Sequence, residues 1–226
     1  MQEYRRVVAE IDMDAILHNF DDVKKRLNKG TKILAVLKAD GYGHGAVPVA
    51  DLLKDKIDYF GVSIIEEAKE LRQSGIKNPI LIFGYTSPDH FDELLRSDVE
   101  QTIFQLDVAQ KLSCAAVAMG KTAKIHIEVD TGMTRLGLSP DAESLEIVKQ
   151  IATLPNIEIK GIYTHFACAD FTDKTSEKEQ RKLFLEFLRG VEKSGISIPI
   201  KHICNSAAVV DDDDYFADEI KRYDHL

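Results

Sequence analysis

The stretch KILAVLKADGYGHGA, Lys32–Ala46, joins an apolar run to a lysine and then to a turn that contains three glycines. The run Lys32–Leu37 predicts a buried β-strand, because aliphatic and β-branched residues favour the pleated conformation. Glycines permit the tight backbone paths that other residues resist. Lys38 therefore ends a buried strand with an ammonium group, and this indicates a functional role at the carboxyl end of that strand.

The same alternation of a short apolar run and a charged, helix-periodic stretch continues along most of the chain. Seven runs are predicted strands: Lys32–Leu37, Tyr59–Ile64, Pro79–Gly84, Glu100–Gln105, Ala123–Val129, Ile159–Phe166 and Ile200–Asn205. Repeated β–α alternation implies parallel strands with right-handed crossovers, either in an open doubly wound sheet or in a closed barrel.

The number of strands favours the barrel. Seven strands and their helices end at about residue 205, so an eighth strand completes a TIM barrel near or just beyond Leu226. We therefore expect an α/β fold of the (β/α)8 barrel type, truncated near its eighth strand. The helix predicted over residues 176–195 has one apolar stripe and ends at a glycine. The stripe consists of Leu183, Phe184, Phe187, Leu188 and Val191.

Composition excludes several classes of function. The 226 residues include 29 basic and 38 acidic side chains, a net charge of −9, so no overall positive field attracts a nucleic acid or an anionic membrane. Cys114, Cys168 and Cys204 are odd in number and widely spaced, which is typical of reduced cytosolic cysteines. The charged N-terminus is unlike a signal peptide. We expect a cytoplasmic protein with a small-molecule ligand.

Polar residues gather where the predicted strands end: Lys38, Arg135, His165, Asn205 and Ser206. Each alone is explained as a surface or packed residue, but in a barrel all of them converge on one mouth. A lysine beside other cations in a desolvated mouth reacts as a neutral amine with an aldehyde, and Ser206 before a helix offers a phosphate seat. This combination suggests pyridoxal phosphate. A Schiff-base phosphosugar lyase stays an alternative.

Four separated motifs resemble the alanine racemase family, in the family's order. They are AVLKADGYGHGA, DTGMTRLG, YTHFACAD and NSAAV, and the resemblance runs from AEIDMDAILHN to NSAAV. It implies pyridoxal-phosphate-dependent racemisation of a small amino acid, most simply L-alanine to D-alanine for peptidoglycan synthesis, with serine as a further substrate. The family resemblance also implies a homodimer, no metal, and a division into residues 1–13, a strand segment that pairs with a C-terminal β domain, and 14–226, the barrel.

The resemblance implies a role for each matching residue. Lys38 would carry the cofactor and move the substrate's α-proton on one face, while Tyr42 and Ser206 would hold the phosphate. Arg135 would face the cofactor's phenolic oxygen and the substrate carboxylate. His165 and Asn205 would support an arginine that faces the pyridine nitrogen. His44 is expected to shape the glycine turn rather than transfer protons.

Two departures from the family pattern stand out. Many relatives have a carbamate-modified lysine two residues before the DTGM aspartate, where this chain has Glu128, so we expect its carboxylate to present the negative charge to Arg135. The second base of the family is a tyrosine from the partner subunit's C-terminal domain, and nothing here matches that domain. The RYDHL segment with Arg222 does not match the family's RPG-like block either.

Two other functions stay open beside the racemase. A single-domain carrier of pyridoxal phosphate fits the length of the chain, and a barrel decarboxylase of basic amino acids uses the same cofactor but usually has a different lysine motif. Reading the gene beyond codon 226 discriminates the first from the racemase. The run Asp211–Asp214 is expected to be a solvated acidic turn rather than a metal site.

Overall fold

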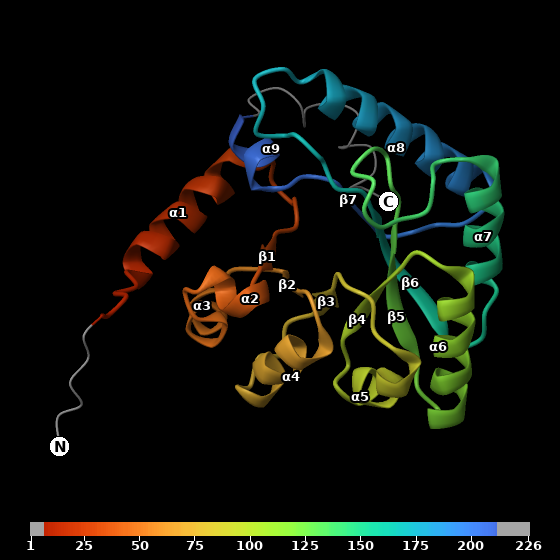
Figure 1. Cartoon of the computed structure of the whole chain (residues 1–226), viewed down its shortest axis with the longest axis horizontal. Helices are drawn as coiled ribbons and strands as arrows, with labels where there is room; N and C mark the ends of the chain where they lie inside the picture. Colours follow the sequence, from red (N-terminus) through yellow and green to blue (C-terminus); the bar gives the residue numbers. More distant parts are fainter. Residues whose placement is uncertain (1–6, 212–226) are drawn as a thin grey trace.

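A computed structural model describes residues 7–211 of the chain, and these residues form one parallel sheet with helices around it (Figure 1). The seven strands lie side by side in the order of the sequence, from β1 to β7. Their bounds are β1 Leu34–Val36, β2 Tyr59–Val62, β3 Ile80–Ile82, β4 Glu100–Ile103, β5 Ala123–Glu128, β6 Ile157–Tyr163 and β7 Ile200–His202. All seven predicted strands are confirmed, and every adjacent pair is parallel.

The strand order distinguishes the two candidate folds. A doubly wound sheet reverses its strand order at a switch point, whereas this sheet has no reversal and curls along its length (Figure 1). The architecture is that of a TIM barrel that lacks its eighth strand within the described residues, with β1 and β7 as the two edges.

Helices connect consecutive strands and cover the outer face of the sheet (Figure 1). Their bounds are α1 Met13–Arg26, α2 Lys38–Tyr42, α3 Ala46–Leu53, α4 Ile65–Gln73, the short 3-10 helix Pro88–His90, α5 Phe91–Arg96, α6 Leu106–Met119, α7 Ala142–Ala152, α8 Thr175–Lys193 and α9 Ser206–Asp211. The outward residues of the strands, such as Phe60, Ile82 and Ile125, are fully buried and belong to the main apolar cluster under these helices. The hydrophobic core thus lies between sheet and helices, and it leaves the inner face of the sheet to other side chains.

The strands are shorter than the sequence predicts, and this moves the candidate residues off the strands. Lys38 lies two residues beyond β1 and begins α2, although the sequence places it at the strand's end. His165 likewise follows β6, and Asn205 follows β7, each after a short loop segment. The chain leaves the strand conformation already at Leu37, where ψ is 12°. The candidate residues therefore lie on loops at the rim, which is where barrels place binding residues.

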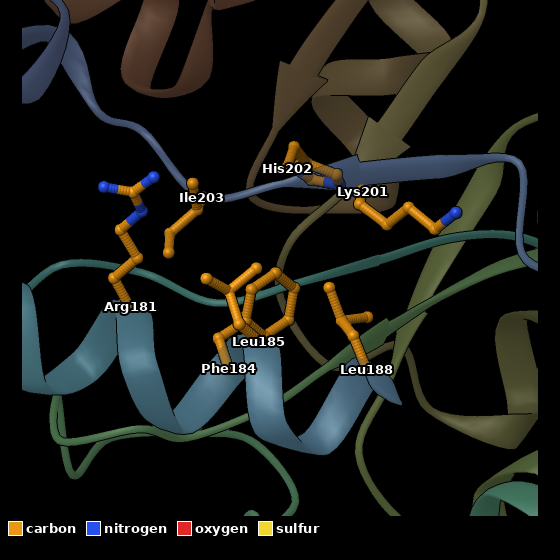
Figure 2. A pocket seen from close by; sticks show the side chains of 7 residues that line it. All are labelled: Arg181, Phe184, Leu185, Leu188, Lys201, His202 and Ile203. Carbon is orange, nitrogen blue, oxygen red and sulfur yellow. The ribbon is translucent and has the colours of Figure 1, made fainter. Parts of the chain in front are cut away.

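The apolar stripe of α8 contains four of the five predicted residues, and the fifth is replaced by another leucine. Phe184, Phe187, Leu188 and Val191 are buried, but Leu183 is 39% exposed and Leu185 takes its place in the core. Figure 2 shows Phe184, Leu185 and Leu188 on the side of α8 that faces Lys201, His202 and Ile203, where they line a small pocket. The stripe is centred on the residues that meet β7, and the sequence does not reveal where β7 lies.

Residues 7–12 have no regular secondary structure, so the pairing of segment 1–13 with a further domain stays a prediction. No helix of the described part is long and apolar enough to span a bilayer. Asp212–Asp214 and Arg222 lie outside the described residues, so the interpretation of the acidic run is not tested.

Candidate active site

Lys38 is followed by a left-handed turn of the backbone. Ala39, Asp40, Gly41 and Tyr42 all have φ between 52° and 60°. A left-handed conformation costs roughly 1–2 kcal/mol for each residue that has a Cβ atom, and strain of this kind concentrates at functional sites. The turn is closed by hydrogen bonds from Gly41 N–H to the Leu37 carbonyl and from Gly43 N–H to the Ala39 carbonyl, 2.8 and 3.1 Å long.

Two carboxylates hold this turn against its surroundings. The side chain of Glu67 on α4 accepts hydrogen bonds of 2.7 Å from the amides of Ala39 and Ser63. Asp40 accepts one of 2.7 Å from the amide of Ala46, at the start of α3. Charge-assisted bonds of this type are stronger than neutral ones. Glu67 thereby connects the backbone next to Lys38 to the neighbouring β/α unit and offsets part of the strain.

Substitution of Glu67 tests this connection. We expect Glu67→Ala to lower the free energy of unfolding by about 2 kcal/mol, because two amides lose a charged acceptor. The measurement is the midpoint of urea unfolding. Glu70→Ala on the exposed side of the same helix is the control and should stay within about 0.5 kcal/mol. Equal effects of the two substitutions would show that Glu67 does not support the turn.

The histidine in the glycine turn, which the sequence predicts to shape that turn, contacts the turn's own backbone. Nδ1 of His44 lies 3.0 Å from the Gly41 carbonyl oxygen, within the turn itself. The ring therefore braces the turn from its exposed side.

Arg135 lies on a loop that closes back onto β5. The Asp130 amide donates to the Leu138 carbonyl and the Leu138 amide donates to the Glu128 carbonyl, both at 2.8 Å. The side chain of Asp130 accepts from the amides of Gly132 and Thr134, 3.0 and 2.9 Å away. These bonds fix the base of the loop, so the exposed Arg135 extends from a well-defined position.

Electrostatics show that three of the predicted residues share one region. Burial lowers the pKa of His165, and the positive charges of Arg135 and Lys38 lower it further. The ammonium group of Lys38 also lies 5.9 Å from the ring centroid of Tyr42, within cation–π range. Lys38, Tyr42, Arg135 and His165 thus meet at the same rim. A neutral His165 between two cations is suited to hydrogen bonding rather than to charge pairing.

Glu128 is a buried carboxyl group beneath Arg135. Its side chain is 5% exposed, and its Oε2 atom has no hydrogen-bond partner in the described part of the chain. Burial raises the pKa of Glu128 to about 7, against the opposing effects of the Tyr163 hydroxyl and the Arg135 charge. A buried carboxyl oxygen without a hydrogen-bond partner costs free energy. The positive charge of Arg135 offsets part of that cost.

The remaining two predicted residues lie at the end of β7. Asn205 donates from Nδ2 to the Phe166 carbonyl at 3.4 Å, next to His165, and its Oδ1 accepts from the Ala208 amide at 3.1 Å. Asn205 therefore joins the His165 loop to α9. Ser206 is exposed at the first residue of α9, and no hydrogen bond links it to the other candidate residues in the described part.

Comparison with known proteins identifies the family of this chain. Residues 11–222 match the model of the alanine racemase N-terminal domain. The curated alanine racemase of Methanococcus maripaludis is 45% identical over 204 residues, which are 90% of this chain and 55% of that protein. The chain belongs to the alanine racemase family. The alanine racemase of Clostridium tetani is 44% identical over 92% of this chain and 54% of its own length.

Solved structures of the alanine racemase family show the same fold. The alanine racemase of Clostridium difficile 630 superposes with a TM-score of 0.87 at 39% identity, over 88% of this chain and 55% of that one. The Bacillus anthracis alanine racemase with bound L-Ala-P gives 0.85 at 33% identity, over 92% and 54%. The chain spans about half the length of the alanine racemases that it matches.

Two residues that position this family's rim were missed by the sequence reasoning. Glu67 stands at the third position of α4, a place from which glutamate often reaches back to the helix start. Gln180 of α8 accepts from the Ala167 amide and donates to the His165 carbonyl, both at 3.0 Å, and to the Thr131 hydroxyl at 3.3 Å. A buried glutamine in the apolar stripe of α8 was the available signal, because buried polar groups need partners.

Proposed function

We propose that this chain is the cofactor-binding barrel of an alanine racemase that interconverts L- and D-alanine with pyridoxal phosphate. The observation that carries the proposal is the meeting of Lys38, Arg135 and His165 at one rim, in a chain 45% identical to a curated alanine racemase. We further infer that the protein is a cytoplasmic homodimer, as the family resemblance implies. Its product would supply peptidoglycan synthesis, because D-alanine is a building block of that polymer.

The residues at the rim suit pyridoxal phosphate by their chemistry. Lys38 offers a primary amine to the aldehyde, Tyr42 and Ser206 offer hydroxyl groups to the phosphate, and Arg135 offers a guanidinium to the phenolic oxygen. When bound, the cofactor supplies a conjugated ring that acidifies the substrate's α C–H bond. His165 and Asn205 would support an arginine that faces the pyridine nitrogen, and Asn205 already binds the backbone beside His165.

The chemical work of this chain's own residues is proton transfer and charge placement. The neutral amine of Lys38 would take or return the substrate's α-proton on one face. Arg135 holds the substrate carboxylate and the phenolic oxygen in place. A base on the opposite face must complete the racemisation, and we assign it to the partner subunit's C-terminal domain, as in the rest of the family.

A racemase assay tests the proposal directly. The product of the complete reading frame should convert L-alanine to D-alanine in a chiral assay, and L-serine more slowly. The 226-residue chain should bind pyridoxal phosphate and turn over poorly, because one base is supplied from elsewhere. Cofactor binding without any racemisation by the complete product would instead favour the carrier function, and release of carbon dioxide would favour the decarboxylase.

The charge of Glu128 gives a pH prediction. Because its pKa is raised to about 7 in the folded chain from 4.5, the folded state binds the extra proton and stability falls as pH rises through about 7. We expect Glu128→Gln to reduce this loss, so thermal unfolding between about pH 5 and 8 should become flatter. Glu143→Gln on the exposed face of α7 is the control and should keep the original slope. Identical slopes for all three proteins would contradict the burial argument.

The same substitution tests the role of Glu128 beside Arg135. We expect Glu128→Gln to weaken activity and change the cofactor's absorbance above about pH 7, where Glu128 is ionised, because Arg135 then loses its anionic partner. Activity of the unmodified protein should not depend on carbon dioxide, since the carboxylate is present without modification. Unchanged activity and absorbance in Glu128→Gln would reduce Glu128 to a packing residue.

A further inference from the structure

The inner face of the sheet has an unusual composition for a barrel. Barrel interiors are filled mainly by valine, isoleucine and leucine. Here the strand register places Thr102 opposite His126, and Tyr163 opposite both Glu128 and His202, on the face that does not meet the helices. Glu100 lies two residues before Thr102 and therefore on the same face. Polar and ionisable groups thus replace the apolar layers of the usual interior.

These groups form a continuous line of hydrogen bonds across four strands. The Tyr59 hydroxyl donates to Oε1 of Glu100 at 3.4 Å, and Oε2 of Glu100 lies 2.8 Å from Nε2 of His126. Nδ1 of His126 lies 3.0 Å from Nε2 of His202. Glu100 is 3% exposed and His126 is 1% exposed, so water does not replace the contact between them, whereas His202 is partly exposed.

The line reaches the rim at its His202 end. His202 is the last residue of β7, and its ring stacks on Tyr163 with centroids 4.5 Å apart and planes 17° apart. The hydroxyl of Tyr163 is 3.1 Å from that of Thr102. Tyr163 also lies in the electrostatic field of Glu128 and Arg135, since both influence its pKa. The buried line therefore ends directly beneath the residues of the candidate active site.

The donors and acceptors along the line fix the position of each proton. An ionised carboxylate only accepts, so Glu100 requires the N–H of His126 at Nε2. A neutral imidazole held this way has its other nitrogen free as an acceptor, as in carboxylate–histidine pairs of enzymes. Nδ1 of His126 then accepts from Nε2–H of His202. Burial and the neighbouring His126 lower the pKa of His202 well below its usual value, which keeps that ring neutral.

We propose that Glu100, acting through His126, is a positioning residue that fixes His202 as a neutral imidazole with its proton on Nε2 and an acceptor on Nδ1. Such an acceptor binds an N–H or O–H group and repels a phosphate or carboxylate oxygen. The role of this Nδ1 acceptor toward a ligand rests on the proposed function. The proton positions on His126 and His202 do not rest on it.

Nitrogen NMR of the histidine rings tests the proposal without cofactor or substrate. In the 15N-labelled chain near neutral pH, we expect both His126 and His202 to show a protonated Nε2 and an unprotonated Nδ1. A proton on Nδ1 of His202, or a doubly protonated ring of either histidine, would overturn the proposal. Because no ligand is present, this result is independent of whether the protein racemises alanine.

Removing the acceptor-only carboxylate provides the second arm. In Glu100→Gln the amide donates as well as accepts, so the constraint on His126 is lost and the Nδ1 signal of His202 should shift toward the protonated range. Glu177→Gln is the matched control, because Glu177 is a carboxylate 5% exposed on α8, outside the line, and it should leave both rings unchanged. A folded Glu100→Gln protein with the original His202 spectrum would refute the role of Glu100.

Discussion

Replacing Lys38 with alanine is expected to abolish racemisation, with a loss of at least ~10³-fold, because the proposed function makes Lys38 both the general base on one face and the covalent partner of the cofactor. The fold places Lys38 where barrels carry their binding residues, at the carboxyl end of a strand. Lys38 follows β1 at the rim, its amine lies 5.9 Å from the Tyr42 ring, and a strained turn fixes the backbone after it. The measurement is the chiral alanine assay on the complete gene product.

The covalent link can be located chemically. Borohydride treatment of the pyridoxal-phosphate-loaded protein should attach a pyridoxyl group to the peptide that contains Lys38, as mass spectrometry detects. Lys32 is an exposed lysine just before β1, so Lys32→Ala is the matched control and should keep both activity and the modified peptide. A modification found on Lys32, or full activity in Lys38→Ala, would refute the assignment.

The second large effect is expected inside the barrel, where Gly161 of β6 makes room for His126. A Cβ atom at position 161 would overlap the imidazole of His126, with Cγ only 2.9 Å away. The ring cannot withdraw, because Glu100 and His202 bind it from two sides. We expect Gly161→Ala to lower the free energy of unfolding by about 3 kcal/mol in urea, since overpacking in a buried site forces side chains off their positions.

Two further variants isolate the cause of that effect. Gly190→Ala in α8 adds the same methyl group where the nearest atom, Cδ2 of Leu145, is 3.5 Å away, and it should raise stability by about 0.5–1 kcal/mol. The double variant Gly161→Ala with His126→Ala should recover part of the loss, because the overlapping ring is gone. An unchanged urea midpoint for Gly161→Ala would show that the interior is not tightly packed around His126.

The rim residues could be predicted from the sequence because they stand in local motifs. Lys38 precedes its glycine turn, and Asn205 follows its strand, so strand ends alone placed them on one side of the sheet. Glu67 and Gln180 were missed because most of their partners are backbone groups, among them the Ala39 amide, 28 residues from Glu67, and the His165 carbonyl, 15 residues from Gln180. Backbone groups leave no mark in the sequence, so the position of Glu67 in α4 and of Gln180 in the α8 stripe indicates a polar group that needs a partner but does not say which partner it has.

Side-chain direction is a second property that local patterns leave open. The period of α8 identified four of the five residues of its apolar stripe, but the structure buries Leu185 and leaves Leu183 39% exposed. A helix of period 3.6 has intermediate positions whose burial depends on the exact line of contact with the neighbouring strand.

The sequence by itself determined the seven β/α units, their parallel order and the lysine at the rim, because periodicity, glycine turns and strand-end residues are encoded over short distances. Only the tertiary structure decided that Glu100, His126 and His202 form one buried line. His126 and His202 are separated by 76 residues, and curling of the sheet brings their rings to 3.0 Å. Register between strands is a property of the assembled sheet. It brings the side chains of these three strand residues within hydrogen-bonding distance of one another.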